Sequence, residues 1–290
     1  MAFQKYDLHT HTTASDGSLS PVELFELANE HDIKILALTD HDSVAGVKHL
    51  RALQQQKKLK QDIKIIPGAE LTCLLNNQIL HVVALNVDVD NLSLTDHLLK
   101  LHQLRIERAE KIALKLQKCK LPDLMPYVLN KVKDGQIGRP HFAKVLCDLG
   151  IVANEAAAFK KYLGAGKSAN VKVQWPELEE VLAVIQDAGG VAVLAHPTKY
   201  KLTMSKLRKV IAAFAEFGGN GIEISYPGVT LEQQKILKYE ADKHQLLVSA
   251  GSDFHTPSNT WVELGRYPEL PRDMPHVLEH CLNSKVEAAT

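Results

Sequence analysis

Residues 33–42 read IKILALTDHD, and this stretch decides how the chain is expected to fold. The first six residues form an apolar run typical of a buried strand, and the polar residues TDHD follow where that strand should end. Comparable apolar runs occur at 63–66, 81–85, 191–195, 221–224 and 246–250, and helical segments are expected at 21–31, 44–55, 175–188 and 231–244. The repeated strand-helix units predict an α/β architecture with a parallel sheet closed into a barrel.

The first of these helices carries clear start signals. Ser20 is a suitable N-cap, Pro21 fits the first helical position, and Glu23 follows the cap at the spacing of a capping box. A helix is therefore expected to begin at residue 21.

Residues 93–170 break the rhythm of strands and helices. A long helical pattern at 98–116 leads through a Pro-containing turn at 121–126 into further short helices. We therefore expect a mostly α-helical insertion domain at 93–170, set in a barrel formed by 1–92 and 171–290. Residues 100–172 contain 15 Lys and Arg against 6 Asp and Glu, although the whole chain has no net charge. This segment is either a solvated lysine-rich surface or a substrate-binding cap that attracts phosphate, and its place in the insertion favours the cap.

Composition excludes several classes of protein. No apolar run approaches the roughly 18 residues of a transmembrane helix, and the N-terminus has no signal-peptide core, so no membrane association is expected. The four cysteines are scattered without CxxC spacing, which argues against a disulfide framework or a zinc ribbon. A reducing cytoplasm is the predicted location.

A His-x-His pair follows the N-terminal apolar residues. His9 and His11 are separated by one residue, so on a strand both imidazoles project from the same face and form a two-pronged metal clamp. Further His, Asp and Glu residues recur beside the other apolar runs, and at the C-terminal ends of barrel strands such residues share one face. The complete candidate set is His9, His11, Asp16, His41, Glu70, His81, His196, Asp253 and His255. His81 fits least well, because it begins its apolar run instead of following it.

The ordered motifs resemble the polymerase and histidinol phosphatase (PHP) family of phosphoesterases. The matching segments are DLHTH (7–11), SDG (15–17), TDHD (39–42), GAE (68–70), His81, AHP (195–197) and GSDFH (251–255). The resemblance spans most of the chain and implies a distorted seven-stranded α/β barrel with a centre of two or three metal ions. It also implies hydrolysis of a phosphoester by a metal-activated hydroxide.

The resemblance assigns the candidate ligands to three ions. His9, His11, Glu70 and Asp253 would bind the first, a bridging Glu70 with His81 and His196 the second, and Asp16, His41 and His255 the third. Many relatives have His at the position of Asp16, and a carboxylate there favours manganese or iron over zinc, with magnesium also acceptable.

Two further aspartates adjoin these ligands. Asp40, beside His41, is a candidate catalytic residue that orients an imidazole, and Asp7 is a candidate for the same task. Both could equally be residues that form turns at strand ends.

Basic motifs in the insertion suggest capture of a second phosphate. They are LRIERA (104–109), IGRPHF (137–142) and YLGAGK (162–167). Arg108, Arg139, His141 and Lys167 are the candidate substrate-binding residues, with Arg139 also a candidate catalytic residue, because Arg matches phosphate bidentately and Lys supplies a point charge. Solvation of the surface is the alternative role for each, and for Arg105 it is the preferred one.

These motifs, together with SDFHTP (252–257) and WVELGR (261–266), resemble one PHP branch almost end to end. That branch comprises bacterial 3′,5′-nucleotide bisphosphate phosphatases and 5′→3′ exoribonucleases of the ribonuclease AM type. The resemblance implies removal of the 3′-phosphate from a nucleoside 3′,5′-bisphosphate such as pAp, or cleavage of short RNA that carries a 5′-phosphate. No protein partner is implied.

Three alternatives use the same motifs. Another PHP phosphatase, such as a histidinol phosphatase, would use the same metals on a different ester. A metal-dependent amidohydrolase also opens with His-x-His, but its metal-bridging lysine or carboxylate pattern cannot be placed here. A non-catalytic nucleic-acid accessory module should have lost ligands, whereas all nine are present.

Overall fold

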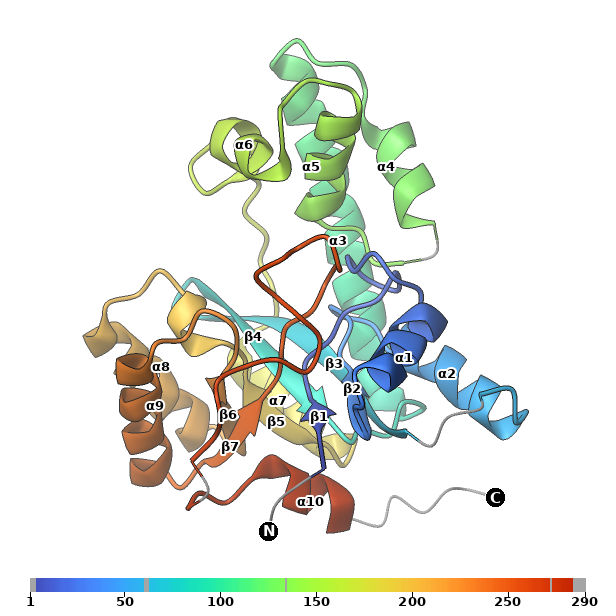
Figure 1. Cartoon of the computed structure of the whole chain (residues 1–290). Coiled ribbons are helices and arrows are strands. Elements are labelled where there is room, and N and C mark those ends of the chain that lie inside the picture. The colour runs from blue at the N-terminus through green and yellow to red at the C-terminus, as the bar shows by residue number, and fades with distance from the viewer. Residues whose placement is uncertain (1–3, 60–62, 134, 272, 284–290) are drawn as a thin grey trace.

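A seven-stranded sheet forms the centre of the computed structural model, which describes residues 4–59, 63–133, 135–271 and 273–283. The outer ends of the two predicted barrel segments thus lie outside the described residues. The strands are β1 (Tyr6–Asp7), β2 (Ile35–Leu38), β3 (Lys64–Leu75), β4 (Gln78–Leu85), β5 (Val191–Leu194), β6 (Gly221–Ser225) and β7 (Leu247–Ala250). They pair in the order of the chain, and Figure 1 shows the sheet curled with helices around it. The predicted α/β barrel is confirmed.

The barrel is nearly closed by the residues that follow its first and last strands. Thr10 pairs with Phe254 in an isolated parallel bridge. The His9 carbonyl accepts a hydrogen bond from the Asp253 N–H at 2.8 Å, and the Phe254 carbonyl accepts one from the His11 N–H at 2.9 Å. Closure therefore joins the two loops in which the HTH and SDFH motifs lie.

The expectation of a wholly parallel sheet is wrong at β4. This strand runs antiparallel to both β3 and β5, whereas the remaining pairs are parallel. The link from β3 to β4 is a two-residue turn in which Asn76 and Asn77 have φ of 51° and 63°. Such left-handed pairs suit the twist of a tight hairpin, and asparagine tolerates them. Because β4 is reversed, its first residues lie at the same end of the barrel as the last residues of the parallel strands, which explains the position of His81.

Helices cover the outside of the barrel and one of its ends. They are α1 (Pro21–Glu30), α2 (Ala45–Gln55), α7 (Leu178–Asp187), α8 (Met204–Glu216), α9 (Leu231–Lys243) and α10 (Val277–Asn283). The Ser20 capping box predicted for α1 is present, with Ser20 N–H donating to Glu23 Oε2 at 2.7 Å. Helix α8 was not among the expected segments. None of the helices in the described ranges is long and apolar enough to cross a membrane.

The barrel interior is apolar toward α10. Ile35, Ile66, Val83 and Val193 point inward and pack with Val277 of α10. Their sequence neighbours, such as Leu36 and Leu194, face outward against the helices, as expected from the alternation of side chains along a strand. This packing leaves the other end of the barrel interior for polar side chains.

A helical lobe rises from the barrel (Figure 1). It contains α3 (Leu92–Lys118), α4 (Met125–Val132), α5 (Arg139–Asp148), α6 (Glu155–Ala158) and the π-helical turn Phe159–Leu163. With 27 residues, α3 extends about 40 Å. Its first half, including Leu98, packs on the barrel core, whereas its second half, including Leu116, belongs to a separate core within the lobe. The long helix therefore holds the lobe beside the end of the barrel that α10 leaves open.

Candidate metal centre

All nine candidate ligands meet at this end of the barrel. Their ligand atoms form four overlapping groups, and within each group they lie within 4.8 Å of one another. The groups are His9, His11 and Asp253; His9, Glu70 and His196; His41, Glu70 and His81; and His11, Asp16, His41 and His255. The shared members join the groups into one continuous cluster.

Glu70 lies at the centre of this cluster. It is fully buried in β3, which lies between β2 and β4 in the sheet. One carboxylate oxygen, Oε1, lies 3.0 Å from both His81 Nδ1 and His196 Nε2. The other, Oε2, lies 2.9 Å from His41 Nδ1 and 3.3 Å from His11 Nε2. A carboxylate with each oxygen facing different imidazoles has the geometry of a bridging ligand.

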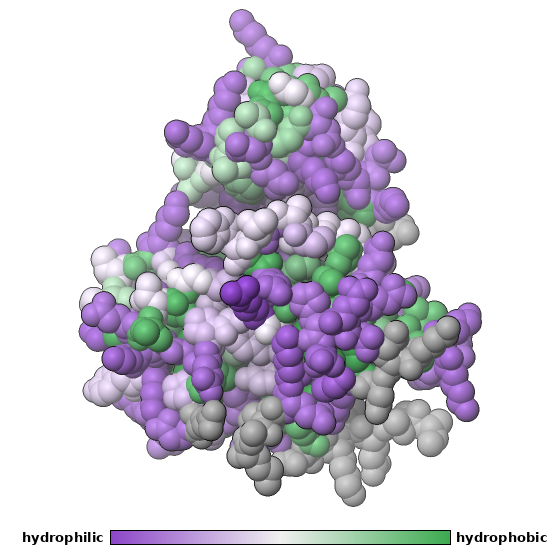
Figure 2. All heavy atoms as spheres, in the orientation of Figure 1, coloured by the Kyte–Doolittle hydropathy of each residue, from purple (hydrophilic) through white to green (hydrophobic). Residues whose placement is uncertain are grey.

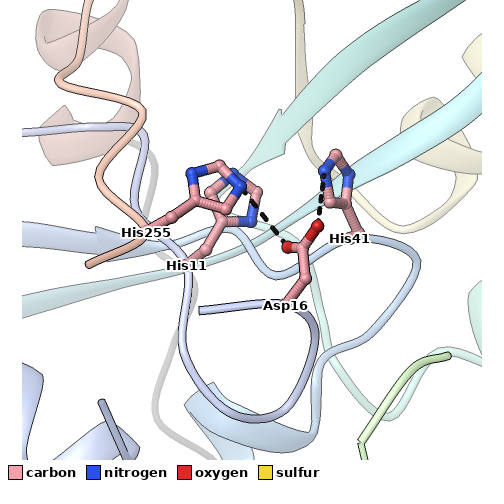
Figure 3. A group of neighbouring side chains, drawn as sticks. All are labelled: His11, Asp16, His41 and His255. Carbon is pink, nitrogen blue, oxygen red and sulfur yellow. Dashed lines mark ion pairs between the residues drawn. The ribbon is translucent and has the colours of Figure 1, made fainter. Parts of the chain in front are cut away.

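Asp16 lies at the centre of the group that it forms with His11, His41 and His255. Figure 3 shows its carboxylate between the rings of His41 and His255. Asp16 Oδ1 lies 3.3 Å from His255 Nε2, and Oδ2 lies 3.9 Å from His41 Nε2. The His11 and His255 rings stack with centroids 4.1 Å apart. The side chains expected to form the third metal site are thus adjacent to those of the other two expected metal sites.

The electrostatics of the cluster suit cations. Burial opposes ionisation of Glu70, yet the charges of His41, His81 and His9 outweigh it and keep the pKa of Glu70 well below its ordinary value. Burial lowers the pKa of His11 to about 3. Burial acts in the same direction on His9, His41 and His255, but the facing carboxylates raise the pKa of these three rings, so metal binding there would displace protons. Ionised carboxylates and neutral imidazoles are the forms that bind metal ions.

Several ligand atoms of the cluster are buried without a hydrogen-bond partner in the structure. They are His9 Nε2, both ring nitrogens of His11, Asp16 Oδ1, His41 Nδ1, Glu70 Oε2 and His196 Nδ1. Buried polar atoms are rarely left unsatisfied, and such a concentration calls for a bound ion. The donor set of imidazoles and carboxylates therefore fits divalent metal ions.

Glu223 is a site residue that the sequence analysis missed. It is buried in β6, where Oε1 accepts a hydrogen bond from His9 Nδ1 at 2.8 Å and Oε2 accepts one from the His196 N–H at 2.6 Å. A carboxylate behind a ligating imidazole fixes the orientation of the ring. The available signal was a single Glu within the apolar run 221–224.

The hydrogen bonds of Asp40 and Asp7 favour the second of their two expected roles, that of residues that order turns and loops at strand ends. Asp40 accepts hydrogen bonds from the Thr12 N–H at 2.7 Å and from the Ser15 hydroxyl at 2.7 Å. Asp7 accepts from the N–H groups of Ser252 at 2.9 Å and Gly265 at 2.7 Å. Asp40 therefore orders the loop before Asp16, which differs from the predicted catalytic role, and Asp7 orders the loops near Asp253.

Arg105 has neither of the roles considered for it. The side chain is buried, and it donates from Nε to Asp42 Oδ2 at 2.6 Å and from Nη2 to Thr72 Oγ1 at 3.2 Å. Nη1 also donates to the Ile137 carbonyl in the lobe at 3.4 Å. Arg105 therefore joins the barrel to the lobe, and the expected surface position is wrong.

The other basic candidates differ in position. Burial, reinforced by the charges of Arg139 and Arg105, lowers the pKa of Arg108 to about 9. Burial and Arg105 likewise lower the pKa of Arg139. Burial lowers the pKa of His141, and the nearby Asp16 carboxylate opposes this shift. Lys167 is exposed in the loop after the π-helical turn. Arg108, Arg139 and His141 are thus half-buried in the lobe, whereas Lys167 lies at the surface.

An α/β barrel that carries a cluster of His and carboxylate side chains at the ends of its strands is typical of metal-dependent hydrolases. The chain belongs to the PHP domain family, whose model matches residues 7–225. This confirms the resemblance inferred from the motifs.

Similar proteins share nearly the whole chain. A 5′-3′ exoribonuclease of Haemophilus influenzae is 39% identical over 92% of this chain and 95% of its own length. A 3′,5′-nucleoside bisphosphate phosphatase of Chromobacterium violaceum is 32% identical over 91% and 92%, respectively.

Two solved structures resemble nearly the whole chain. A protein of Chromobacterium violaceum described as an amidohydrolase with bound sulfate and no metal has a TM-score of 0.88 and 31% identity, over 96% of both chains. A structure from Bifidobacterium adolescentis described as a metal-dependent phosphoesterase has a TM-score of 0.80 and 27% identity, over 97% of this chain and 96% of the other.

Proposed function

We propose that the nine clustered side chains hold two or three divalent metal ions and that the protein hydrolyses phosphate esters. The concentration of buried ligand atoms without hydrogen-bond partners carries this proposal. His9, His11, Glu70 and Asp253 would hold one ion, Glu70 with His81 and His196 a second, and Asp16, His41 and His255 a third. Bound divalent ions polarise phosphoryl oxygens and lower the pKa of water, so no serine or cysteine nucleophile is required. Glu223 would hold the His9 ring in place behind this centre.

The arginine pair of the lobe supports a substrate with two phosphates. Arg108 and Arg139 are half-buried, Arg108 Nε is buried without a hydrogen-bond partner, and no ion pair with a carboxylate joins either side chain within the described ranges. Two desolvated cations without a counterion favour an anionic ligand, and the guanidinium fork matches phosphate. We infer that they anchor a 5′-phosphate while the metal centre receives a 3′-linked phosphoryl group.

The proposed substrates are nucleoside 3′,5′-bisphosphates such as pAp, and short RNA with a 5′-phosphate. Both present a 3′-linked phosphoryl group at a fixed distance from the 5′-phosphate, so one site can act on both. The relatives named as an exoribonuclease and as a bisphosphate phosphatase support this pair of activities. His141, whose pKa is influenced by the Asp16 carboxylate as well as by burial, would also contact the substrate, and Lys167 would assist from the surface.

The alternatives account for fewer of these features. A histidinol phosphatase would use the metal centre but would leave the half-buried Arg108 and Arg139 without a ligand. A non-catalytic accessory module would not require nine gathered ligands.

Replacing Arg139 tests the anchoring role. Arg139→Ala should lower kcat/KM for adenosine 3′,5′-bisphosphate by about 10- to 100-fold, because a charge-assisted hydrogen bond contributes about 1.5–3 kcal/mol. Hydrolysis of adenosine 3′-monophosphate, which has no 5′-phosphate, should change little. Arg51→Ala on α2 is a matched control that should affect neither substrate. Equal losses on both substrates with Arg139→Ala would refute the anchor.

We further propose manganese as the preferred metal, with iron, zinc or magnesium as alternatives, since the Asp16 carboxylate makes the third site harder. The four cysteines are all free, which supports a reducing cytoplasm as the location. The proposal involves no membrane and no protein partner.

A further inference from the structure

Trp261 is an exposed aromatic side chain beside a pocket. It lies on the segment between β7 and α10 and is 90% exposed, whereas large aromatic side chains usually bury most of their surface. The pocket has a volume of about 420 Å³, and its lining includes Pro227, Gly228, Arg266 and Tyr267. This volume falls within the range of ligand sites. In Figure 1 the segment crosses between barrel and lobe, where Figure 2 shows pale side chains of intermediate hydropathy.

A continuous set of contacts links this pocket to the metal centre. Lys199 Nζ lies 2.6 Å from Asp253 Oδ2 and 5.6 Å from the centroid of the Tyr226 ring. Pro227, which lines the pocket, directly follows Tyr226. Trp261 is only six residues beyond His255, which limits their separation to roughly 20 Å even for an extended chain. Trp261 therefore lies on the chain segment that follows the ligand His255, and Pro227 of the pocket is joined through Tyr226 and Lys199 to Asp253.

The pocket and the arginine pair approach different parts of the cluster. Arg105, which connects the lobe to the barrel, contacts Asp42 next to His41, and His141 of the lobe is close to Asp16. The contacts that lead to the pocket start instead from Asp253. With a 5′-phosphate at the arginines and the scissile phosphoryl group at the metals, the remainder of an RNA chain would leave on the Asp253 side.

We propose that Trp261 stacks on a nucleobase of the RNA chain downstream of the scissile bond. The open ring face accepts any base, and stacking would supply most of the binding, because Arg266 at the same pocket is paired with Glu263 at 2.9 Å. Trp261 would then determine specificity by favouring RNA over a nucleoside bisphosphate, which ends at the scissile phosphate. This inference rests on the proposed function.

A substrate series tests the stacking role. We would measure kcat/KM of wild type, Trp261→Ala and Trp261→Phe on adenosine 3′,5′-bisphosphate and on 5′-phosphorylated oligoadenylates of two to six nucleotides. Trp261→Ala should lose about 10-fold on oligoadenylates long enough to reach the pocket and should keep bisphosphate hydrolysis, which also shows that it is folded. Trp261→Phe should retain most of the activity. Tyr239→Ala, an exposed aromatic on α9, is the matched control and should change neither.

A binding measurement separates this inference from the proposed function. Anisotropy of a 3′-labelled, 5′-phosphorylated hexa-adenylate in EDTA should show about 10-fold weaker binding by Trp261→Ala even if wild type hydrolyses neither substrate. Hydrolysis by wild type with no effect of Trp261→Ala on any oligoadenylate would overturn the stacking role alone. Equal losses on bisphosphate and RNA would also overturn it. So would unchanged RNA binding with an altered oligomeric mass, which would indicate a second copy of the chain at this pocket.

Discussion

Glu223 should control the affinity of the centre for metal ions. Its two oxygens accept hydrogen bonds from His9 Nδ1 at 2.8 Å and from the backbone N–H of His196 at 2.6 Å, so it orients the ring of one candidate ligand and holds the backbone of another. Glu223→Gln keeps the size and one acceptor oxygen but removes the negative charge behind His9. Loss of such a carboxylate typically weakens metal binding by about 10- to 100-fold, or about 1.4–2.7 kcal/mol. We therefore expect manganese affinity to fall within this range.

The assay would titrate Mn²⁺ into chelator-treated protein. Affinity would be read from competition with a metal-binding dye and, in parallel, from phosphate release from adenosine 3′,5′-bisphosphate. Glu240→Gln is the matched control, because Glu240 is equally buried but pairs with Arg208 on the outside of the barrel. Unchanged affinity in Glu223→Gln, or an equal loss in Glu240→Gln, would refute the orienting role.

Two predictions concern stability. Arg105→Met should destabilise the protein by about 3–5 kcal/mol in urea unfolding, because it leaves the buried Asp42 carboxylate without its partner; a loss below about 1 kcal/mol would contradict the clasp between barrel and lobe. His276 should make the fold sensitive to acid, because burial lowers its pKa from 6.5 to about 4. The folded state then binds fewer protons than the unfolded state between these values, so stability present above pH 6.5 should fall by roughly 3 kcal/mol toward pH 4. His276→Asn, which keeps an acceptor for the Leu278 N–H, should flatten this part of the pH profile; an unchanged slope would exclude His276 as its source.

The sequence predicted the strands better than their directions. The runs 63–66 and 81–85 were expected to be separate strands of a parallel sheet, with Glu70 in the segment after the first run. In the structure β3 continues past Glu70 and Thr72, since these two side chains face the polar end of the barrel. There Glu70 contacts His81, and Thr72 contacts Asp42. The tight turn at Asn76 could have indicated the hairpin.

Gathering of the candidate ligands could be predicted because each lies next to an apolar strand, and strands align residues by topology. The partners of the buried charged residues could not be predicted, since the two members of each pair are distant along the chain. Arg105 pairs with Asp42, 63 residues earlier, and Glu223 bonds His9, 214 residues earlier. The periodicity of apolar residues carries no information on such pairs, so the buried Arg105 was predicted to lie at the surface.

Phosphate release by the metal-loaded protein tests the central claim most directly. The protein would be analysed for bound metal and assayed with adenosine 3′,5′-bisphosphate and with histidinol phosphate, before and after chelation, alongside His9→Ala. We predict bound divalent metal, faster turnover of the bisphosphate, and loss of activity both on chelation and in His9→Ala. Equal or faster turnover of histidinol phosphate, or full activity without metal, would contradict the account.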